Sequence, residues 1–301
     1  MKHFKLPVLL LALSFIFTLL LAGCGAATTG GESTTETTAA VTEATTAAET
    51  SATTTQQELK VLKVGATPVP HAEILKFITP ILKEKGIDLQ VVEFTDYVQP
   101  NLALQNKELD ANYFQHVPYL EDFNKKNNTQ LSAAVPVHFE PLGLFPGKTK
   151  KLEDLKSGDT IAVPNDTTNE ARALLLLESA GIIKVKADAG LTATVKDIVE
   201  NPKKIKITEL EAAQISRSLP DVNLAVINGN YALEAGLNAA TDALKSEDKD
   251  SLAAKTFANI ITVRTGDENR EDIKILDEVI TSPEVRDYIN QQYKGAVVPV
   301  F

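Results

Sequence analysis

Alternating and helical patterns of apolar residues divide the chain into strands and helices from residue 59 onward. Residues 59–66 alternate as a strand. A helix over 71–85, ending before Gly86, is predicted by apolar residues at helical spacing: Ile74, Leu75, Ile78, Ile81 and Leu82. The same reasoning predicts a strand at 89–94, a helix at 97–105 and a strand at 109–114. This β-α-β-α-β order favours parallel strands covered by helices.

Similar elements recur after residue 145. Strands are predicted at 160–164, 205–207 and 224–227, with helices at 170–180 and 231–235. A strand at 260–264 and one long amphipathic helix at 270–291 close the chain. The pattern predicts an α/β protein of two lobes: lobe 1 comprises 59–145 and 259–301, and lobe 2 comprises 146–258. A ligand cleft is expected between the lobes, at the carboxyl ends of the strands.

One apolar run, at 6–21, lies outside this pattern and follows the basic residues Lys2 and Lys5. At roughly 16 residues it is shorter than a spanning helix needs, which weighs against a transmembrane segment with an incidental cysteine. Small residues follow it, so 1–23 is predicted to be a secretory signal peptide. The tetrad LAGC, ending at Cys24, resembles the bacterial lipoprotein box. That resemblance implies diacylation of Cys24 and attachment to the extracytoplasmic face of the cell membrane.

Composition changes again over 24–58, which is rich in Thr, Ala and Glu. Such a segment buries too little apolar surface to fold, so it is predicted to be a disordered tether; an O-glycosylated stalk is the alternative. The whole chain carries a net charge of −10 and a single cysteine. The acidic balance argues against nucleic acid as a partner, and the lone cysteine excludes a disulfide framework within the folded part.

Aromatic and polar residues gather at 110–120, at the end of the strand predicted at 109–114 and just beyond it: Tyr113, Phe114, His116 and Tyr119. Aromatic rings beside a hydrogen-bonding group suit a ligand that is apolar at one end. The alternative interpretation places Tyr113 and Phe114 in the core and His116 in a loop.

A second candidate follows the strand at 160–164. Thr167 and Glu170 have the spacing of a capping box, and Arg172 is expected in the first turn of the helix that follows. A guanidinium beside helix N-terminal amides can bind a carboxylate through both oxygens. The alternative is an exposed Arg172 paired with Glu170 or Asp166.

Five segments together resemble the methionine-binding lipoproteins of bacterial ABC importers. They are TPVPHAEIL at 67–75, EFTDYVQPN at 93–101, YFQH at 113–116, PNDTTNEARALLLL at 164–177 and VINGNYA at 226–232. The resemblance covers 60–301. It implies a periplasmic-binding-protein-like fold that captures methionine, or a relative such as D-methionine or a methionine-containing dipeptide, for a permease and ATPase complex.

The resemblance also implies roles for single residues. Tyr97, Phe114, His116 and Tyr119 would line the pocket for the ligand side chain, and Arg172 would hold its carboxylate. Asn228 or Asn230 would hold the amino or carboxylate end. No cofactor, metal or catalytic residue is implied.

Other function classes have weaker support. A metal-ion receptor would draw on His71, His116 and His138, but none has the spacing of a known metal motif. An enzyme would lack a nucleophile motif and a glycine-rich phosphate loop. An adhesive surface lipoprotein remains the third alternative.

Overall fold

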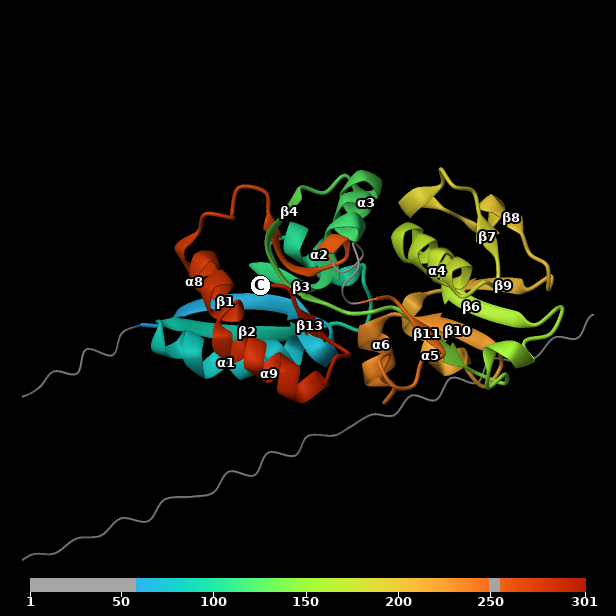
Figure 1. The fold of residues 1–301 in the computed structure, drawn as a ribbon. Coiled ribbons are helices and arrows are strands. Elements are labelled where there is room, and N and C mark those ends of the chain that lie inside the picture. Colours follow the sequence, from blue (N-terminus) through green and yellow to red (C-terminus); the bar gives the residue numbers. More distant parts are fainter. Residues whose placement is uncertain (1–57, 249–254) are drawn as a thin grey trace, which may run out of the picture. The chain divides into compact units, whose positions relative to one another are not determined.

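The structure is a computed structural model that describes residues 58–248 and 255–301. The predicted signal peptide, the predicted acylation site at Cys24 and nearly all of the predicted tether lie outside these residues. Within them, no helix has both the length and the apolar character needed to cross a membrane. The described residues form two mixed sheets, each with helices on both faces (Figure 1).

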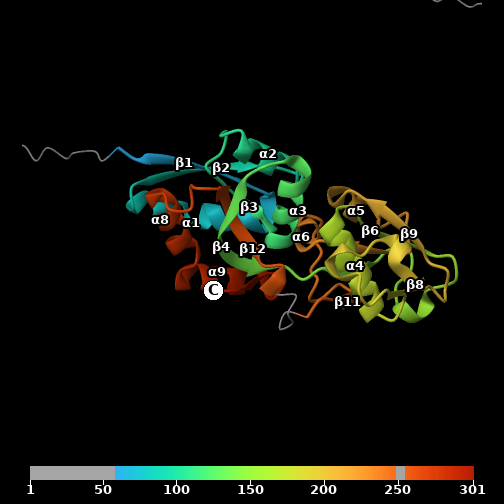
Figure 2. The same ribbon diagram turned by 90° about the horizontal axis from the view of Figure 1, so that it is seen from above.

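The first sheet has the strand order β13-β4-β12-β3-β1-β2. Its strands β1, β2 and β3 are parallel, as predicted, whereas β12, β4 and β13 run antiparallel to their neighbours; Figure 2 shows β3, β4 and β12 together. The strands span Lys60–Ala66 (β1), Ile87–Glu93 (β2), Ala111–His116 (β3), Leu131–Phe139 (β4), Asn259–Arg264 (β12) and Val298–Pro299 (β13). The helical segments around this sheet are η1 (Pro68–Ala72), α1 (Glu73–Glu84), α2 (Gln99–Gln105), α3 (Val117–Asn127), α8 (Glu271–Ile280) and α9 (Pro283–Tyr293).

Alternation along β1 explains how this sheet packs. Leu62 and Val64 are fully buried in one core with Ile74 and Ile78 of α1, to which α8 and α9 also contribute. Helices α2 and α3 cover the other face (Figure 1), where Gly65 lies so close to Leu109 that a Cβ would approach its Cδ1 to 2.5 Å. The helical stripe in α1 therefore follows from burial against the sheet.

The second sheet has the order β11-β5-β10-β6-β9. Strands β10, β6 and β9 are parallel, and β5 and β11 pair antiparallel. Along β10, Leu224 and Val226 face the core under α4, while Ala225 and Ile227 face the core under α5 and α6. The strands span Gly143–Pro146 (β5), Thr160–Pro164 (β6), Lys206–Leu210 (β9), Leu224–Ile227 (β10) and Lys245–Ser246 (β11), with α4 at Thr167–Ser179, α5 at Ala212–Ser218 and α6 at Gly229–Glu234.

Smaller elements surround the second sheet. Strands β7 (Lys184–Val185) and β8 (Ile198–Glu200) form a separate hairpin, and 3₁₀ turns occupy Leu152–Asp154 (η2), Gly190–Thr192 (η3) and Val195–Asp197 (η4).

The chain passes between the two sheets from β4 to β5, through Glu140, and again from β11 to β12, through Glu247. The predicted lobe boundary after residue 145 falls inside β5, which pairs with β10 of the second sheet. Hydrogen bonds also join the two halves directly. Tyr231 Oη donates to the Thr95 carbonyl at 3.2 Å, and Lys126 Nζ donates to Thr167 Oγ1 at 2.5 Å.

Two local predictions are wrong. The single helix expected over 270–291 is two helices, because Ser282 caps a new helix, accepting from the Val285 amide at 3.4 Å, and Pro283 is its first residue. The capping box of Thr167 and Glu170 does not form. Helix α4 starts at Thr167 itself, and Asp166 caps it by accepting from the Asn169 amide at 3.0 Å.

Candidate functional site

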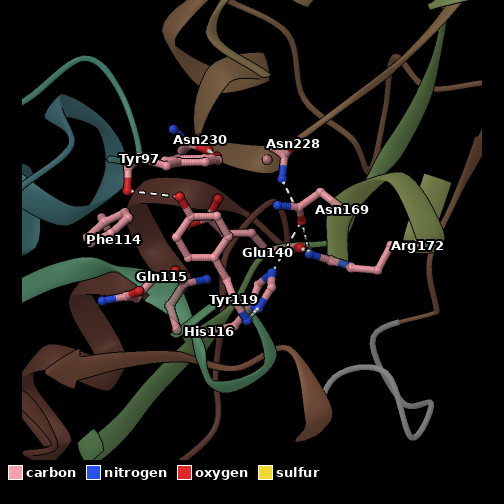
Figure 3. A pocket seen from close by; sticks show the side chains of 12 residues that line it. Tyr97, Phe114, Gln115, His116, Tyr119, Glu140, Asn169, Arg172, Asn228 and Asn230 are labelled. Atoms are coloured by element: carbon pink, nitrogen blue, oxygen red, sulfur yellow. Dashed lines mark hydrogen bonds between the residues drawn. The ribbon is translucent and has the colours of Figure 1, made fainter. Parts of the chain in front are cut away.

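A pocket between the two sheets brings together all seven residues predicted to bind a ligand (Figure 3). They come from the ends of strands and from the segments that follow, as expected for an α/β fold. The pocket is lined by Tyr97, Phe114, Gln115, His116, Tyr119, Glu140, Asn169, Arg172, Asn228, Gly229, Asn230 and Asn259.

Aromatic rings form one wall of the pocket. The Tyr97 ring lies 5.8 Å from Phe114 and 5.7 Å from Tyr119, between ring centroids. Hydrogen bonds fix the hydroxyl groups: Tyr97 donates to Asn230 Oδ1 at 2.6 Å, and Tyr119 donates to the Tyr97 carbonyl at 3.0 Å. Burial raises the pKa of both tyrosines, so they stay neutral and the wall is uncharged.

His116 ends β3 and caps α3. Its Nδ1 accepts from the Tyr119 amide at 3.2 Å, so the ring proton is on Nε2, which donates to Asn169 Oδ1 at 3.2 Å. Burial, and then the charge of Arg172, lower the pKa of His116 to about 3. The ring is therefore a neutral hydrogen-bond donor at neutral pH.

Asn169 connects the polar side of the pocket. Its Oδ1 accepts from His116, from Arg172 Nη1 at 3.3 Å and from Asn228 Nδ2 at 3.0 Å, as Figure 3 shows. Its Nδ2 donates to both oxygens of Asp166, at 2.9 and 3.0 Å. Asn228 Oδ1 is buried and has no hydrogen-bond partner among the described residues. That oxygen is left as an acceptor for a ligand donor.

Arg172 is 4% exposed and lies one turn further into α4 than predicted. Its Nε and Nη2 bind the Glu247 carboxylate at 3.0 and 2.5 Å, and its Cζ lies 4.2 Å from the Phe257 ring centroid. The expected alternative of an exposed pair with Glu170 or Asp166 is wrong. Because Glu247 occupies the Nε–Nη2 edge, a ligand carboxylate can reach only the remaining side of the guanidinium.

Glu140 supplies a carboxyl group to the pocket. It is 6% exposed, and its Oε1 lies 2.7 Å from His138 Nε2 and 3.2 Å from His71 Nε2. Burial raises the pKa of Glu140, whereas His71, the Asn230 amide and Arg172 act in the opposite direction. Gly229 leaves room for this side chain, because a Cβ there would lie 2.6 Å from Glu140 Cβ. The pocket thus holds a guanidinium and a carboxyl group beside an aromatic wall.

The sequence profile of the NlpA lipoprotein family matches residues 62–301. The chain belongs to this family. The match confirms the resemblance drawn from the five segments. MetQ of Bacillus subtilis, a methionine-binding lipoprotein, is 42% identical over 245 residues, which cover 80% of this chain and 88% of MetQ.

Solved structures of other proteins confirm the two-lobe α/β fold of this NlpA lipoprotein. A nutrient-binding protein from Burkholderia cenocepacia, bound to methionine, is 46% identical with a TM-score of 0.76, covering 80% of this chain and all (100%) of that protein. A periplasmic substrate-binding protein of an ABC transporter from Coxiella burnetii is 40% identical with a TM-score of 0.75, covering 79% of this chain and 100% of that protein.

Sequence reasoning did not assign five lining residues of the NlpA-family pocket: Gln115, Glu140, Asn169, Gly229 and Asn259. Gln115, Asn169 and Gly229 belong to the five segments that resemble the methionine-binding lipoproteins. They lie at the end of a predicted strand or just after one, and this position could have marked them as lining residues. Glu140 follows β4, a strand that the pattern did not reveal. Asn259 begins the closing strand.

The three histidines considered for a metal site separate into two places. His71 and His138 lie with Glu140, and one ligand atom from each falls within 4.8 Å of the others. His116 is not part of that group and bonds to Asn169.

Proposed function

We propose that this NlpA-family lipoprotein captures methionine, or a close relative such as D-methionine or a methionine-containing dipeptide, and delivers it to the permease and ATPase complex of an ABC importer. One observation carries the proposal: a buried guanidinium and a buried carboxylate lie at the polar end of a pocket whose other wall is aromatic. The names of the relatives support the same ligand and the same transporter role.

The zwitterionic end of an α-amino acid matches the polar end of the pocket. Its carboxylate would bind the Nη1 side of Arg172, which Glu247 does not occupy, and its ammonium would bind Glu140 and the unpartnered Asn228 Oδ1. Asn230 Oδ1 already accepts from Tyr97, but its buried Nδ2 has no hydrogen-bond partner among the described residues, so Asn230 would offer a donor to the carboxylate. Charges at such depth require partners, because each would otherwise carry its full desolvation cost.

The aromatic wall suits the thioether. Sulfur is polarizable and gains about 0.3–1.5 kcal/mol from each well-placed ring contact. Tyr97, Phe114 and Tyr119 would flank a linear apolar side chain, and His116 would close the pocket as a neutral donor. A polar side chain such as that of glutamine would be buried there with too few partners.

Capture would involve closure of the lobes around the ligand rather than catalysis. Sheet membership supports a first lobe of 59–142 with 259–301, and a second lobe that begins at β5. The lipid on Cys24 would hold the protein at the extracytoplasmic face of the membrane, and the segment 24–58 would let the lobes reach the permease.

The direct test is to identify what the protein carries. Full-length lipoprotein is extracted in mild detergent, denatured and analysed by mass spectrometry for released small molecules; methionine or a methionine-containing peptide is expected. Calorimetry with the stripped and refolded protein then measures binding of L-methionine, D-methionine and glycyl-methionine. Tighter binding of glutamine or of a charged amino acid would contradict the aromatic-pocket assignment.

A further inference from the structure

Glu140 is held from outside the pocket by two buried histidines. His71, 1% exposed, and His138, fully buried, both reach Oε1 of this carboxylate, and neither lines the pocket. Behind them, Thr67 Oγ1 lies 2.7 Å from His71 Nδ1, and the Tyr113 hydroxyl is hydrogen-bonded to His138 Nδ1. Hydrogen bonds thus join Tyr113, His138 and Glu140. His71 is hydrogen-bonded to Thr67 and Asn259, with its Nε2 3.2 Å from Glu140 Oε1.

The hydrogen-bond partners of the His71 and His138 imidazoles determine which ring nitrogen carries the hydrogen. His71 Nε2 faces two acceptors, Glu140 Oε1 and Asn259 Oδ1 at 3.1 Å, so it must carry the hydrogen, and Nδ1 then accepts from Thr67. The Tyr113 hydroxyl likewise donates to His138 Nδ1, which leaves the His138 Nε2 hydrogen for Glu140. Burial lowers the pKa of His71 to about 4 and that of His138 to about 3. Both rings are therefore neutral donors at neutral pH.

These donors make a buried carboxylate possible. An ionised carboxylate accepts about four hydrogen bonds. One comes from His138 and one from the Asn230 amide, and His71 Nε2 lies 3.2 Å from Oε1 while it donates to Asn259. The carboxylate therefore keeps acceptor capacity for a donor in the pocket that Glu140 lines.

A metal ion fits this arrangement poorly. Two ligands of a tetrahedral zinc ion lie about 3.3 Å apart. The separation between His138 Nε2 and Glu140 Oε1 is 2.7 Å, which is a hydrogen-bond distance. The spacing is thus that of hydrogen-bonded groups rather than of metal ligands.

We propose that His71 and His138 are positioning residues that keep Glu140 ionised and oriented toward the pocket, and so make the protein select ligands with a protonated amino group. This inference rests on the proposed capture of an amino acid. It adds that selection for the ammonium group depends on two side chains that do not touch the ligand.

The test compares two ligands that differ only in the amino group: L-methionine and its desamino analogue, 4-(methylthio)butanoate. Calorimetry on the full-length lipoprotein in detergent is expected to show that His138→Phe weakens methionine binding at least about tenfold, the effect of losing a hydrogen bond to a charged group. Binding of the analogue should change less than about threefold, because the analogue makes no contact with Glu140. His138→Gln keeps a donor near the Nε2 position and should restore most of the methionine affinity. His71→Phe removes a ring that is hydrogen-bonded to Asn259 and lies 3.2 Å from Glu140, so it should weaken methionine binding selectively but less than His138→Phe, and His71→Gln should lose less than His71→Phe.

Two controls keep the result interpretable. Tyr293→Phe removes another hydroxyl of the same lobe, which donates to Glu73 Oε2 over a distance of 2.7 Å. Neither residue lines the pocket, so this variant should change neither the affinity for methionine nor that for the analogue. Tyr113→Phe removes only the hydroxyl behind His138, so it remains usable if His138→Phe does not fold, and it too should weaken methionine binding selectively.

Equal losses for both ligands, or no loss, would overturn the positioning role. One equivalent of tightly bound metal in the purified protein would overturn it in favour of a metal site. Wild-type protein that binds neither ligand would instead refute the proposed function, and wild-type protein that binds both equally would refute the contact between Glu140 and the ammonium.

Discussion

Replacing Arg172 by alanine tests the charge pairing of the pocket at its most connected residue. The guanidinium binds Glu247 through two nitrogens, Asn169 through a third, and the Glu140 carbonyl at 3.4 Å. Its removal leaves Glu247 buried without its cation. It also removes the proposed partner of the ligand carboxylate.

Arg172→Ala is expected to have two separate costs, one in folding free energy and one in binding free energy. Breaking a buried ion pair costs about 3–5 kcal/mol of folding free energy. Glu247 is 10% exposed and can regain some hydration, so a loss near 3 kcal/mol is expected, or about 6–12 °C in Tm. An unpaired ligand carboxylate costs about 2–5 kcal/mol of binding, which is about 30- to 5,000-fold in Kd.

Arg264→Ala is the matched control. Arg264 is 16% exposed, donates to the carbonyls of Leu104 and Leu109 and pairs with Asp267 at 2.7 Å, outside the pocket. Thermal unfolding should show that both variants lose stability, and calorimetry with L-methionine should show that only Arg172→Ala loses affinity. Adding Glu247→Gln to Arg172→Ala should recover stability but not binding. A binding loss below about 1 kcal/mol in Arg172→Ala, or an equal loss in Arg264→Ala, would refute the assignment of the carboxylate site.

Three further results are expected. Cys24→Ala should move the protein from the detergent phase to the aqueous phase in a partition assay without lowering its Tm; unchanged partitioning would contradict lipidation at this residue. In competition assays, methionine should bind more tightly than norleucine, and norleucine more tightly than isoleucine or valine, because sulfur and a linear chain suit the aromatic wall. Asp277, whose Oδ1 is buried with no hydrogen-bond partner in the described part of the chain, has its pKa raised by burial to about 7. Its stabilising contribution is present at low pH and is lost as pH rises toward 7, since the folded state then holds a proton that the unfolded state has released. Asp277→Asn should therefore raise Tm more at pH 8 than at pH 5, and an equal gain at both values would disprove the coupling.

The sequence predicted the regular elements where burial is one-sided and uninterrupted. Strand β1 and helix α1 have clean periodicity because each packs one face against the same core. Strand β4 was not predicted, because Pro136 lies within it and register shifts against β12 disturb its alternation. The break before α9 was missed although the apolar spacing widens from Ile280 to Val285 and the Ser282–Pro283 pair signals a new helix.

The candidate site was predictable where residues follow predicted strands. Arg172 and Asn228 come after parallel neighbours, β6 and β10, so their meeting follows from topology. Glu140 and Glu247 lie where the chain passes between sheets. No local pattern marks such positions, and Glu247 reaches Arg172 across 75 residues of sequence. The charged partners of the site were therefore beyond sequence reasoning, whereas the chemistry of its aromatic wall was not.

The direct hydrogen bonds between the two halves have a consequence for how such a receptor is tuned. Tyr231 with Thr95 and Lys126 with Thr167 join protein groups alone, outside the pocket lining. In the proposed capture mechanism they stabilise the closed form to the same extent whatever the cargo. The apparent Kd equals the intrinsic Kd divided by the fraction of molecules that is competent to bind. Substitutions in these bonds would scale the affinity for every cargo by one factor and leave their ranking unchanged. Evolution can then change the overall affinity through these two hydrogen bonds, to match the nutrient supply. Discrimination between nutrients stays with the aromatic wall and the charged residues of the pocket.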